Sequence, residues 1–215
     1  MATAPGQGTR AAASKSTSTR ARIRDEARKL FVSYGIETVT YGDIASRVGT
    51  TRANVHYHYG NKSALVKAVF EDTFERVDAT LRAIWTTPGL TLDQRLERAL
   101  EDARTRFQEF NDDADGRRPW SLSGRARLEN QQVDTAVIDG IVTMSRQFEA
   151  YVGQAIEEAK ASGELRPDAP VREIMLLITP LWYYGSPITQ FSGMNKLEEH
   201  YTATRNVIAR AYGAR

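Results

Sequence analysis

The 215-residue sequence contains no cysteine and no apolar run long enough to cross a lipid bilayer. The absence of cysteine excludes disulfides, thiolate metal sites and cysteine nucleophiles. A membrane-spanning helix needs roughly 18 consecutive apolar residues, and the longest candidate, residues 174–185, is short and contains Pro180. The N-terminus also lacks the apolar core of a signal peptide. We therefore expect a cytoplasmic protein with no membrane partner.

Positive charge is concentrated at the N-terminal end. Residues 1–62 contain 10 Lys/Arg and 4 Asp/Glu, whereas the remaining residues contain 19 Lys/Arg and 23 Asp/Glu. A basic region followed by an acidic one is typical of a protein that meets a polyanion through one end. An ordinary solvated surface has the same composition, so charge alone does not separate the two interpretations.

The periodicity of apolar residues predicts an all-α fold. Residues 1–18 are small and polar and are predicted to form a disordered basic tail, because they offer too little apolar surface to offset the cost of ordering. From residue 19 onward, apolar residues recur at helical spacing, and sustained strand-type alternation is absent. A long helix over residues 63–86, capped by Ser63, links an N-terminal domain over residues 19–62 to a larger helical region over residues 63–215.

Two short helices separated by a glycine turn follow the first long helix. Thr40 can cap the helix "YGDIASRV", Gly49 ends it, and Thr51 can cap the next helix, "RANVHYHY". With the preceding helix they form a three-helix unit with a helix-turn-helix, whose second short helix enters the major groove of double-stranded DNA.

The outer face of this second short helix carries groups suited to DNA. At 100° per residue, Val55 and Tyr59 face inward and Tyr57 faces outward. Arg52 can donate two hydrogen bonds to a guanine edge, and the small Ala53 permits close approach. Imidazole, phenol and ammonium groups suit phosphate oxygens, and threonines at helix N-termini favour anions. The predicted DNA-binding residues are Thr40, Tyr41, Thr51, Arg52, Ala53, Asn54, His56, Tyr57, His58 and Lys62.

The histidines of this stretch also raise the alternatives of a metal site and a catalytic base. His56 and His58 are two residues apart, whereas two histidines that bind one ion from a helix need a spacing of three or four. A catalytic histidine needs an orienting acid, for which Asp43 is a weak candidate, and the sequence contains no nucleophile motif. We therefore predict no metal site, no cofactor and no catalytic residue, and expect that the protein is not an enzyme.

The stretch "TYGDIASRVGTTRANVHYHYGNKSALV" resembles the signature of the TetR family of transcriptional regulators. His56 and Tyr57 stand in the reverse of the order common in that family. The resemblance covers residues 19–70 and implies that the helices after it form a ligand-binding and dimerisation domain. The residues that fall on the signature positions are Thr40, Ile44, Ala45, Gly49, Thr51, Val55, His58, Tyr59, Lys62 and Leu65.

The region after the resemblance contains a helix, residues 174–184, that is apolar on nearly all sides and must be buried all round. Either a homodimer through the last two helices or an internal core can provide that cover. Aromatic, methionine and arginine side chains are candidates for a ligand pocket, although such residues are more often part of a plain core or of a solvated helix face. These candidates are Trp85, Phe107, Trp120, Arg125, Arg127, Met144, Phe148, Trp182 and Tyr183.

These features, together with the resemblance, favour a ligand-responsive, sequence-specific DNA-binding regulator. The resemblance implies a repressor that a small-molecule effector, whose identity the sequence does not indicate, releases from a palindromic operator. The alternatives are a helical small-molecule-binding protein or enzyme with a vestigial DNA-binding head, and a nonspecific nucleoid binder.

Overall fold

The structure is a computed structural model that describes residues 8–129 and 133–214. The described residues form nine helices and no extended strand, which confirms the predicted all-α class; their one β-type contact is an isolated bridge between Leu165 and Gly213. None of these helices is both long and apolar enough to span a membrane. The helices are α1 (Gly8–Tyr34), α2 (Tyr41–Val48), α3 (Arg52–Tyr59), α4 (Lys62–Trp85), α5 (Leu92–Gln108), α6 (Leu122–Leu128), α7 (Thr135–Ala161), α8 (Val171–Tyr183) and α9 (Gly185–Tyr212).

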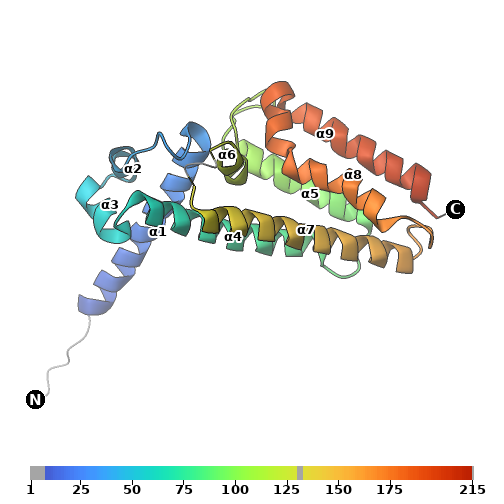
Figure 1. The fold of residues 1–215 in the computed structure, drawn as a ribbon, viewed down its shortest axis with the longest axis horizontal. Helices are drawn as coiled ribbons and strands as arrows, with labels where there is room; N and C mark the ends of the chain where they lie inside the picture. The colour runs from blue at the N-terminus through green and yellow to red at the C-terminus, as the bar shows by residue number, and fades with distance from the viewer. Residues whose placement is uncertain (1–7, 130–132, 215) are drawn as a thin grey trace, which may run out of the picture.

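The molecule is elongated, with the helix-turn-helix at one end (Figure 1). Helices α1, α2 and α3 gather around the start of α4, and α4 then runs alongside α7 into the body formed with α5, α8 and α9. The short helix α6 lies where the two parts meet and packs on both α1 and α7. Because α6 contacts both parts, it is placed to connect the body with the N-terminal domain.

The helix-turn-helix has the predicted caps. The Thr40 hydroxyl accepts from the Asp43 amide and the Asp43 carboxylate accepts from the Thr40 amide, which forms a capping box at the start of α2. Gly49 ends α2 with a left-handed φ of 71°, a conformation that glycine adopts without steric cost. The Thr51 side chain caps α3 by accepting from the Asn54 amide at 3.1 Å.

Helix α1 begins earlier than predicted. We predicted disorder for residues 1–18, but the helix extends back to Gly8; residues 1–7 lie outside the described residues. The sequence contains neither glycine nor proline between Thr9 and Tyr34 and includes three consecutive alanines from Ala11. Adding helical turns to an existing helix avoids the cost of nucleation, so a segment without glycine or proline can extend it.

One further boundary differs from the prediction. Asn61, not Ser63, caps α4, because Gly60 turns the chain so that Asn61 has extended backbone and its side chain accepts from the Ala64 amide at 2.9 Å. Pro180 lies inside α8, which ends at Tyr183. A break occurs within α9 at Gly193, whose φ of 75° requires glycine.

Arg95 on α5 is buried in the body, with 1% of its surface exposed. Its guanidinium donates to the backbone oxygens of Trp85, Thr87 and Leu90 and lies 2.5 Å from the Glu158 carboxylate. These partners satisfy the buried charge and fix the turn between α4 and α5. The position of α5, which forms one wall of the cavity described below, depends on this turn.

Candidate DNA-binding surface and ligand cavity

Helix α3 presents the outward face that the sequence predicts. Val55 and Tyr59 are buried against the three-helix core, whereas Arg52, Ala53 and His56 are exposed. Tyr57 is 81% exposed, which is unusual for so large an apolar ring in a single chain. A face with a guanidinium, an imidazole and a phenol, and with only a methyl group at Ala53, can approach DNA closely and donate hydrogen bonds to it.

Ring contacts hold the aromatic side chains of this face in place. Tyr57 and His58 pack edge to face with their ring centroids 5.3 Å apart. His56 packs in the same way against Tyr41 of α2, at 5.0 Å. Such pairs restrict side-chain rotamers, so the outward groups of α3 are partly ordered before any partner binds.

Tyr41 is placed differently from the prediction that it contacts DNA. Only 7% of its surface is exposed, and its buried hydroxyl has no hydrogen-bond partner in the described part of the chain. Burial raises the pKa of this phenol, and the nearby Tyr59 adds to the effect. Because Tyr41 is at the start of α2, its ring fills the gap between α2 and α3 and supports His56 instead of pointing outward.

Asn54 and Lys62 already have partners within the chain. The half-buried Asn54 amide donates to the Thr50 hydroxyl at 2.8 Å. The Lys62 ammonium donates to the Glu37 carbonyl at 2.6 Å, and burial lowers the pKa of this lysine. Both must give up or share these bonds to reach DNA, whereas Arg52 forms no ion pair or hydrogen bond with any described residue. Of the two candidates for base recognition, Arg52 is therefore the more available.

Thr40 is also committed locally. Its hydroxyl donates to the Asp43 carboxylate at 2.7 Å, and this bond, with that from the Thr40 backbone, holds the pKa of Asp43 below its usual range. A phosphate at the start of α2 would meet this carboxylate. The N-terminus of α3 has no acidic residue in its first turn, so it is the better anion site of the two.

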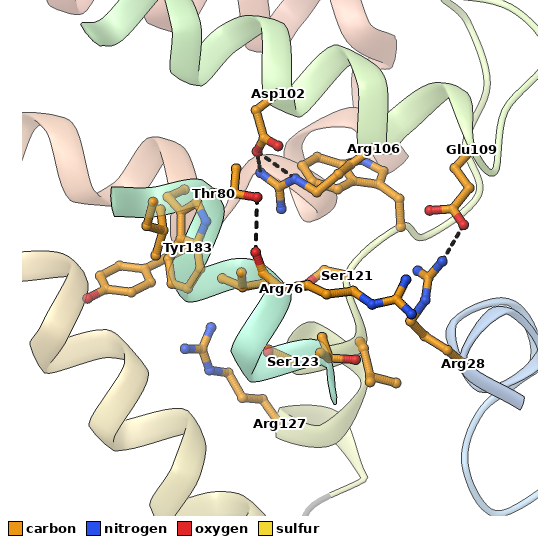
Figure 2. Close-up of a pocket in the computed structure, with 16 residues that line it drawn as sticks. Arg28, Arg76, Thr80, Asp102, Arg106, Glu109, Ser121, Ser123, Arg127 and Tyr183 are labelled. Atoms are coloured by element: carbon orange, nitrogen blue, oxygen red, sulfur yellow. Dashed lines mark hydrogen bonds and ion pairs between the residues drawn. The ribbon is translucent and has the colours of Figure 1, made fainter. Parts of the chain in front are cut away.

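A cavity of about 250 Å³ lies in the body between α4, α5, α6 and α8 (Figure 2). Four predicted pocket residues line it: Trp120, Arg127, Trp182 and Tyr183. Trp85 and Phe148 line a much smaller neighbouring space that Trp182 also borders, and Phe107 lines a separate groove. Arg125 and Met144 line none of these spaces.

Sequence reasoning missed most of the polar wall of the cavity. These residues lie on amphipathic helices, whose polar faces we took to be solvated. Thr73, Val77 and Thr80 form a helical stripe on α4, with spacings of four and three, and this stripe was the signal that could have located them. The missed polar residues are Arg28, Thr73, Arg76, Thr80, Asp102, Arg106, Glu109, Ser121 and Ser123.

The acidic side chains of the cavity are neutralised by neighbouring arginines (Figure 2). Asp102 is 2.8 Å from Arg106 Nε, and Glu109 pairs with Arg28. Arg106 also stands over the ring of Trp120, with its guanidinium carbon 4.9 Å from the ring centroid. The cavity therefore has fixed ion pairs on one side and aromatic rings on the other.

Helix α6, which contributes Ser123 and Arg127 to this cavity, also holds the end of α1. Arg125 donates from Nε to the Val32 carbonyl at 2.9 Å and from Nη2 to the Ser33 carbonyl at 3.0 Å. A guanidinium at a helix C-terminus satisfies free carbonyls and complements the helix dipole. This role replaces the ligand contact that we predicted for Arg125.

Glu129, directly after α6, completes the attachment. Its Oε2 accepts from the Ile36 amide at 2.7 Å and from the Glu37 amide at 3.2 Å. Gly35 allows this approach, because a Cβ there would lie 2.8 Å from the carboxylate, and its φ of 97° also favours glycine. We call the four hydrogen bonds from Arg125 and Glu129 the α6 clamp.

The described residues include no group of His, Asp and Glu side chains arranged to hold a metal ion. Together, the exposed face of α3 and the separate helical body define a helix-turn-helix protein with a cavity outside its DNA-binding domain. Residues 23–69 match the family "Bacterial regulatory proteins, tetR family".

Comparisons with individual proteins agree with this family match. The HTH-type transcriptional regulator TtgR of Pseudomonas putida is 37% identical over 65 residues, which cover 30% of this chain and 31% of that relative. The regulator SrpR of Pseudomonas putida is 27% identical over 158 residues, which cover 73% of this chain and 68% of SrpR. The crystal structure of a TetR transcriptional regulator from Chloroflexus aurantiacus shares the fold, with a TM-score of 0.75 and 18% identity over 94% of this chain and 99% of that one. The N-terminal region is therefore similar to the TetR family of transcriptional regulators in sequence, and the whole chain shares the fold of solved TetR-family structures.

The placement of Tyr41 leads to a prediction for a matched pair of variants. Tyr41→Phe removes a buried hydroxyl without a described partner, so we expect the free energy of unfolding to rise by about 1 kcal/mol. Tyr59→Phe removes a hydroxyl that donates to the Arg20 carbonyl at 2.8 Å, so we expect a fall of about 1 kcal/mol. Urea unfolding of both variants measures the difference; an equal loss in both would contradict the assigned role of Tyr41.

Proposed function

We propose that this protein is a sequence-specific DNA-binding regulator that binds a palindromic operator as a homodimer and loses operator affinity when a small molecule occupies the cavity. The observation that carries the proposal is the outward face of α3, on which Arg52, His56 and Tyr57 are exposed beside Ala53. Repression is the usual consequence in the family, and we propose it here, with the protein acting in the cytoplasm, where the DNA lies.

Each exposed group of α3 has a role in this proposal. Arg52 reads a base edge in the major groove, since it is exposed at the first position of the helix. Tyr57, His56 and the N-terminal N–H groups of α3 bind phosphates and fix the helix in the groove. Lys62 joins them after giving up its bond to the Glu37 carbonyl.

A homodimer through α8 and α9 supplies the second DNA-binding head. Ile174, Ile178 and Leu181 bury one side of α8, while Leu176 and Leu177 on its other side are 57% and 37% exposed. The sequence left open whether a dimer partner or an internal core covers α8. The exposure of Leu176 and Leu177 favours a dimer partner. On α9, Phe191 is 85% exposed, and exposed apolar groups on two adjacent helices are typical of an interface.

The α6 clamp supports a route from the cavity to the DNA. A ligand that contacts Arg127 or Ser123 moves α6, and Arg125 and Glu129 move the end of α1 with it. Since α2 follows that end directly, the two α3 helices of a dimer change their separation. Ligand and operator are then linked by a coupling free energy that is the same in both directions.

The first test of this function uses an operator selected from random DNA with the purified protein. Arg52→Ala should cost roughly 1–3 kcal/mol on that operator and relax the preference at one base pair per half-site. On scrambled DNA the loss should be smaller. Fluorescence anisotropy titrations measure both affinities. Arg146→Ala, which removes the same charge from an exposed position on α7, is the control and should bind like the wild type.

Two outcomes of this test would count against the assignment. If no sequence is enriched by selection, the protein is not a sequence-specific regulator. A second outcome is that Arg52→Ala weakens binding to operator and to scrambled DNA equally, while Asn54→Ala changes the preferred base. In that case Asn54 contacts the base and Arg52 contacts phosphates.

The dimer has its own test. Light scattering of the wild type should give about twice the chain mass of 24.0 kDa. The double variant Leu176→Asp/Val207→Asp places two charges on the exposed apolar face of α8 and α9, so we expect a folded monomer with weakened operator binding. Val142→Asp, on α7 and 42% exposed, is the matched control and should stay dimeric. A double variant that remains a dimer would place the interface elsewhere.

A further inference from the structure

Arg127 stands out among the charged residues of the cavity because its charge is not matched. The cavity is lined by four arginines, Arg28, Arg76, Arg106 and Arg127, and by only two carboxylates. Arg28 forms an ion pair with one of them, Glu109, and Arg106 with the other, Asp102.

The remaining two arginines differ from each other. Arg76 lies 2.8 Å from both Asp25 and Asp72, so it belongs to an ion-pair network between α1 and α4. Arg127 makes no ion pair or hydrogen bond with a residue that the structure describes. Arg127 is thus the cation of the cavity wall that is available to a ligand.

The surroundings of Arg127 are aromatic. Its guanidinium carbon lies 5.6 Å from the ring centroid of Tyr183, and Figure 2 shows the side chain reaching from α6 toward that ring. Tyr183 packs against Trp182 at 5.4 Å, and both line the cavity together with Trp120. A planar ligand can therefore stack on these rings while a polar substituent reaches Arg127.

The hydroxyl of Tyr183 is bound on the α7 side, away from the cavity lining. This hydroxyl lies 3.0 Å from Glu149 and 3.3 Å from the Ser145 carbonyl, both on α7 and outside the cavity lining. Burial, reinforced by the Glu149 carboxylate, raises the pKa of this phenol to about 12, so Tyr183 stays neutral near pH 7. It thus presents an uncharged ring to the cavity.

The size of the cavity limits the ligand. Its volume of about 250 Å³ lies just below the range of roughly 300–1,000 Å³ for sites that enclose drug-sized molecules. One or two fused rings with a short substituent suit this space better than a large multi-ring compound.

We propose that the ligand of this cavity is a small aromatic carboxylic acid, whose ring stacks among Trp120, Trp182 and Tyr183 and whose carboxylate pairs with Arg127. A guanidinium binds a carboxylate through two parallel hydrogen bonds, which also fixes the orientation of the ring. A cationic aromatic ligand would face Arg127 and Arg76 with no unpaired carboxylate among the described lining residues. A neutral ligand would leave the exposed Arg127 guanidinium to solvent and gain no ion pair from it. The inference rests on the proposed function only in treating this cavity as the effector site.

Three probes of nearly equal shape test the proposal: 2-naphthoate, 2-naphthamide and 2-naphthylmethylammonium. Isothermal titration calorimetry of the full-length protein, without DNA, measures each affinity. We expect 2-naphthoate to bind about tenfold more tightly than 2-naphthamide and more tightly still than the ammonium compound, since a hydrogen bond between charged groups contributes more than a neutral one. Arg127→Gln should remove the preference for the acid, and Arg127→Lys should keep part of it.

Arg146→Gln, which removes an exposed charge on α7 away from the cavity lining, is the control and should leave the preference unchanged. Equal affinities for acid and amide, tighter binding of the ammonium compound, or no binding of the acid at millimolar concentration would each overturn the proposal. An unchanged preference in Arg127→Gln would overturn the role of that residue. Because these titrations contain no DNA, their failure is distinguishable from a failure of operator binding.

Discussion

The attachment of α6 to the end of α1 is the constraint on which the rest of the structure depends. Arg125 binds the last carbonyls of α1, and Glu129 binds the next amides, so one short segment satisfies backbone groups on both sides of Gly35. Charged side chains that bind backbone groups form some of the stronger hydrogen bonds in proteins. These bonds fix the direction in which the chain enters α2, and therefore the direction in which α3 faces.

The same segment also borders the cavity, so the α6 clamp connects the cavity with the DNA-binding domain. Ser123 and Arg127 face the cavity, while Arg125 and Glu129 face the DNA-binding domain. Helix α4, which the sequence suggested as the connection between the domains, packs mainly along α7 and forms one wall of the cavity. In our account α4 is the stationary element and α6 is the one that moves with the ligand.

The sequence predicted the helix-turn-helix well, because its signals are local. Thr40, Gly49 and Thr51 act through neighbouring backbone groups, and the buried positions Val55 and Tyr59 follow from helical periodicity. It did not predict that Tyr41 is buried, because that depends on how α2 and α3 pack. The cavity was predicted only in part, since its polar wall combines residues of α1, α4, α5 and α6. The stripe on α4 is visible in the sequence, but periodicity along one helix does not show that these four helices meet. Arg125 looked like a ligand contact because its real partners are more than 90 residues away.

Several basic residues of the N-terminal region bind other groups within the chain, so the excess of positive charge there overstates the charge that can reach DNA. Arg22 donates to the Val48 carbonyl, Arg24 pairs with Asp72, and Arg28 pairs with Glu109, so much of the N-terminal positive charge stabilises the fold. The exposed cations near α3 in the described residues include Arg47, Arg52 and Arg20, whose guanidinium stands over the ring of Tyr59. Since each neutralised phosphate adds to the salt dependence of binding, one head alone offers modest electrostatic affinity. This favours a dimer that combines two heads on one operator.

The most direct test of the account is the change in operator affinity that a cavity ligand causes, measured by anisotropy in the wild type and in Glu129→Gln. The ligand is a compound that calorimetry has shown to bind the wild type and to bind Arg127→Gln more weakly. The account predicts that saturating ligand weakens operator binding by the wild type about fivefold or more, within the usual range of allosteric coupling. In Glu129→Gln, whose amide side chain is a weaker acceptor for the Ile36 and Glu37 amides, the account predicts that the effect is largely lost while the ligand still binds. The same loss of operator affinity in both proteins would contradict the α6 clamp as the connection between cavity and DNA.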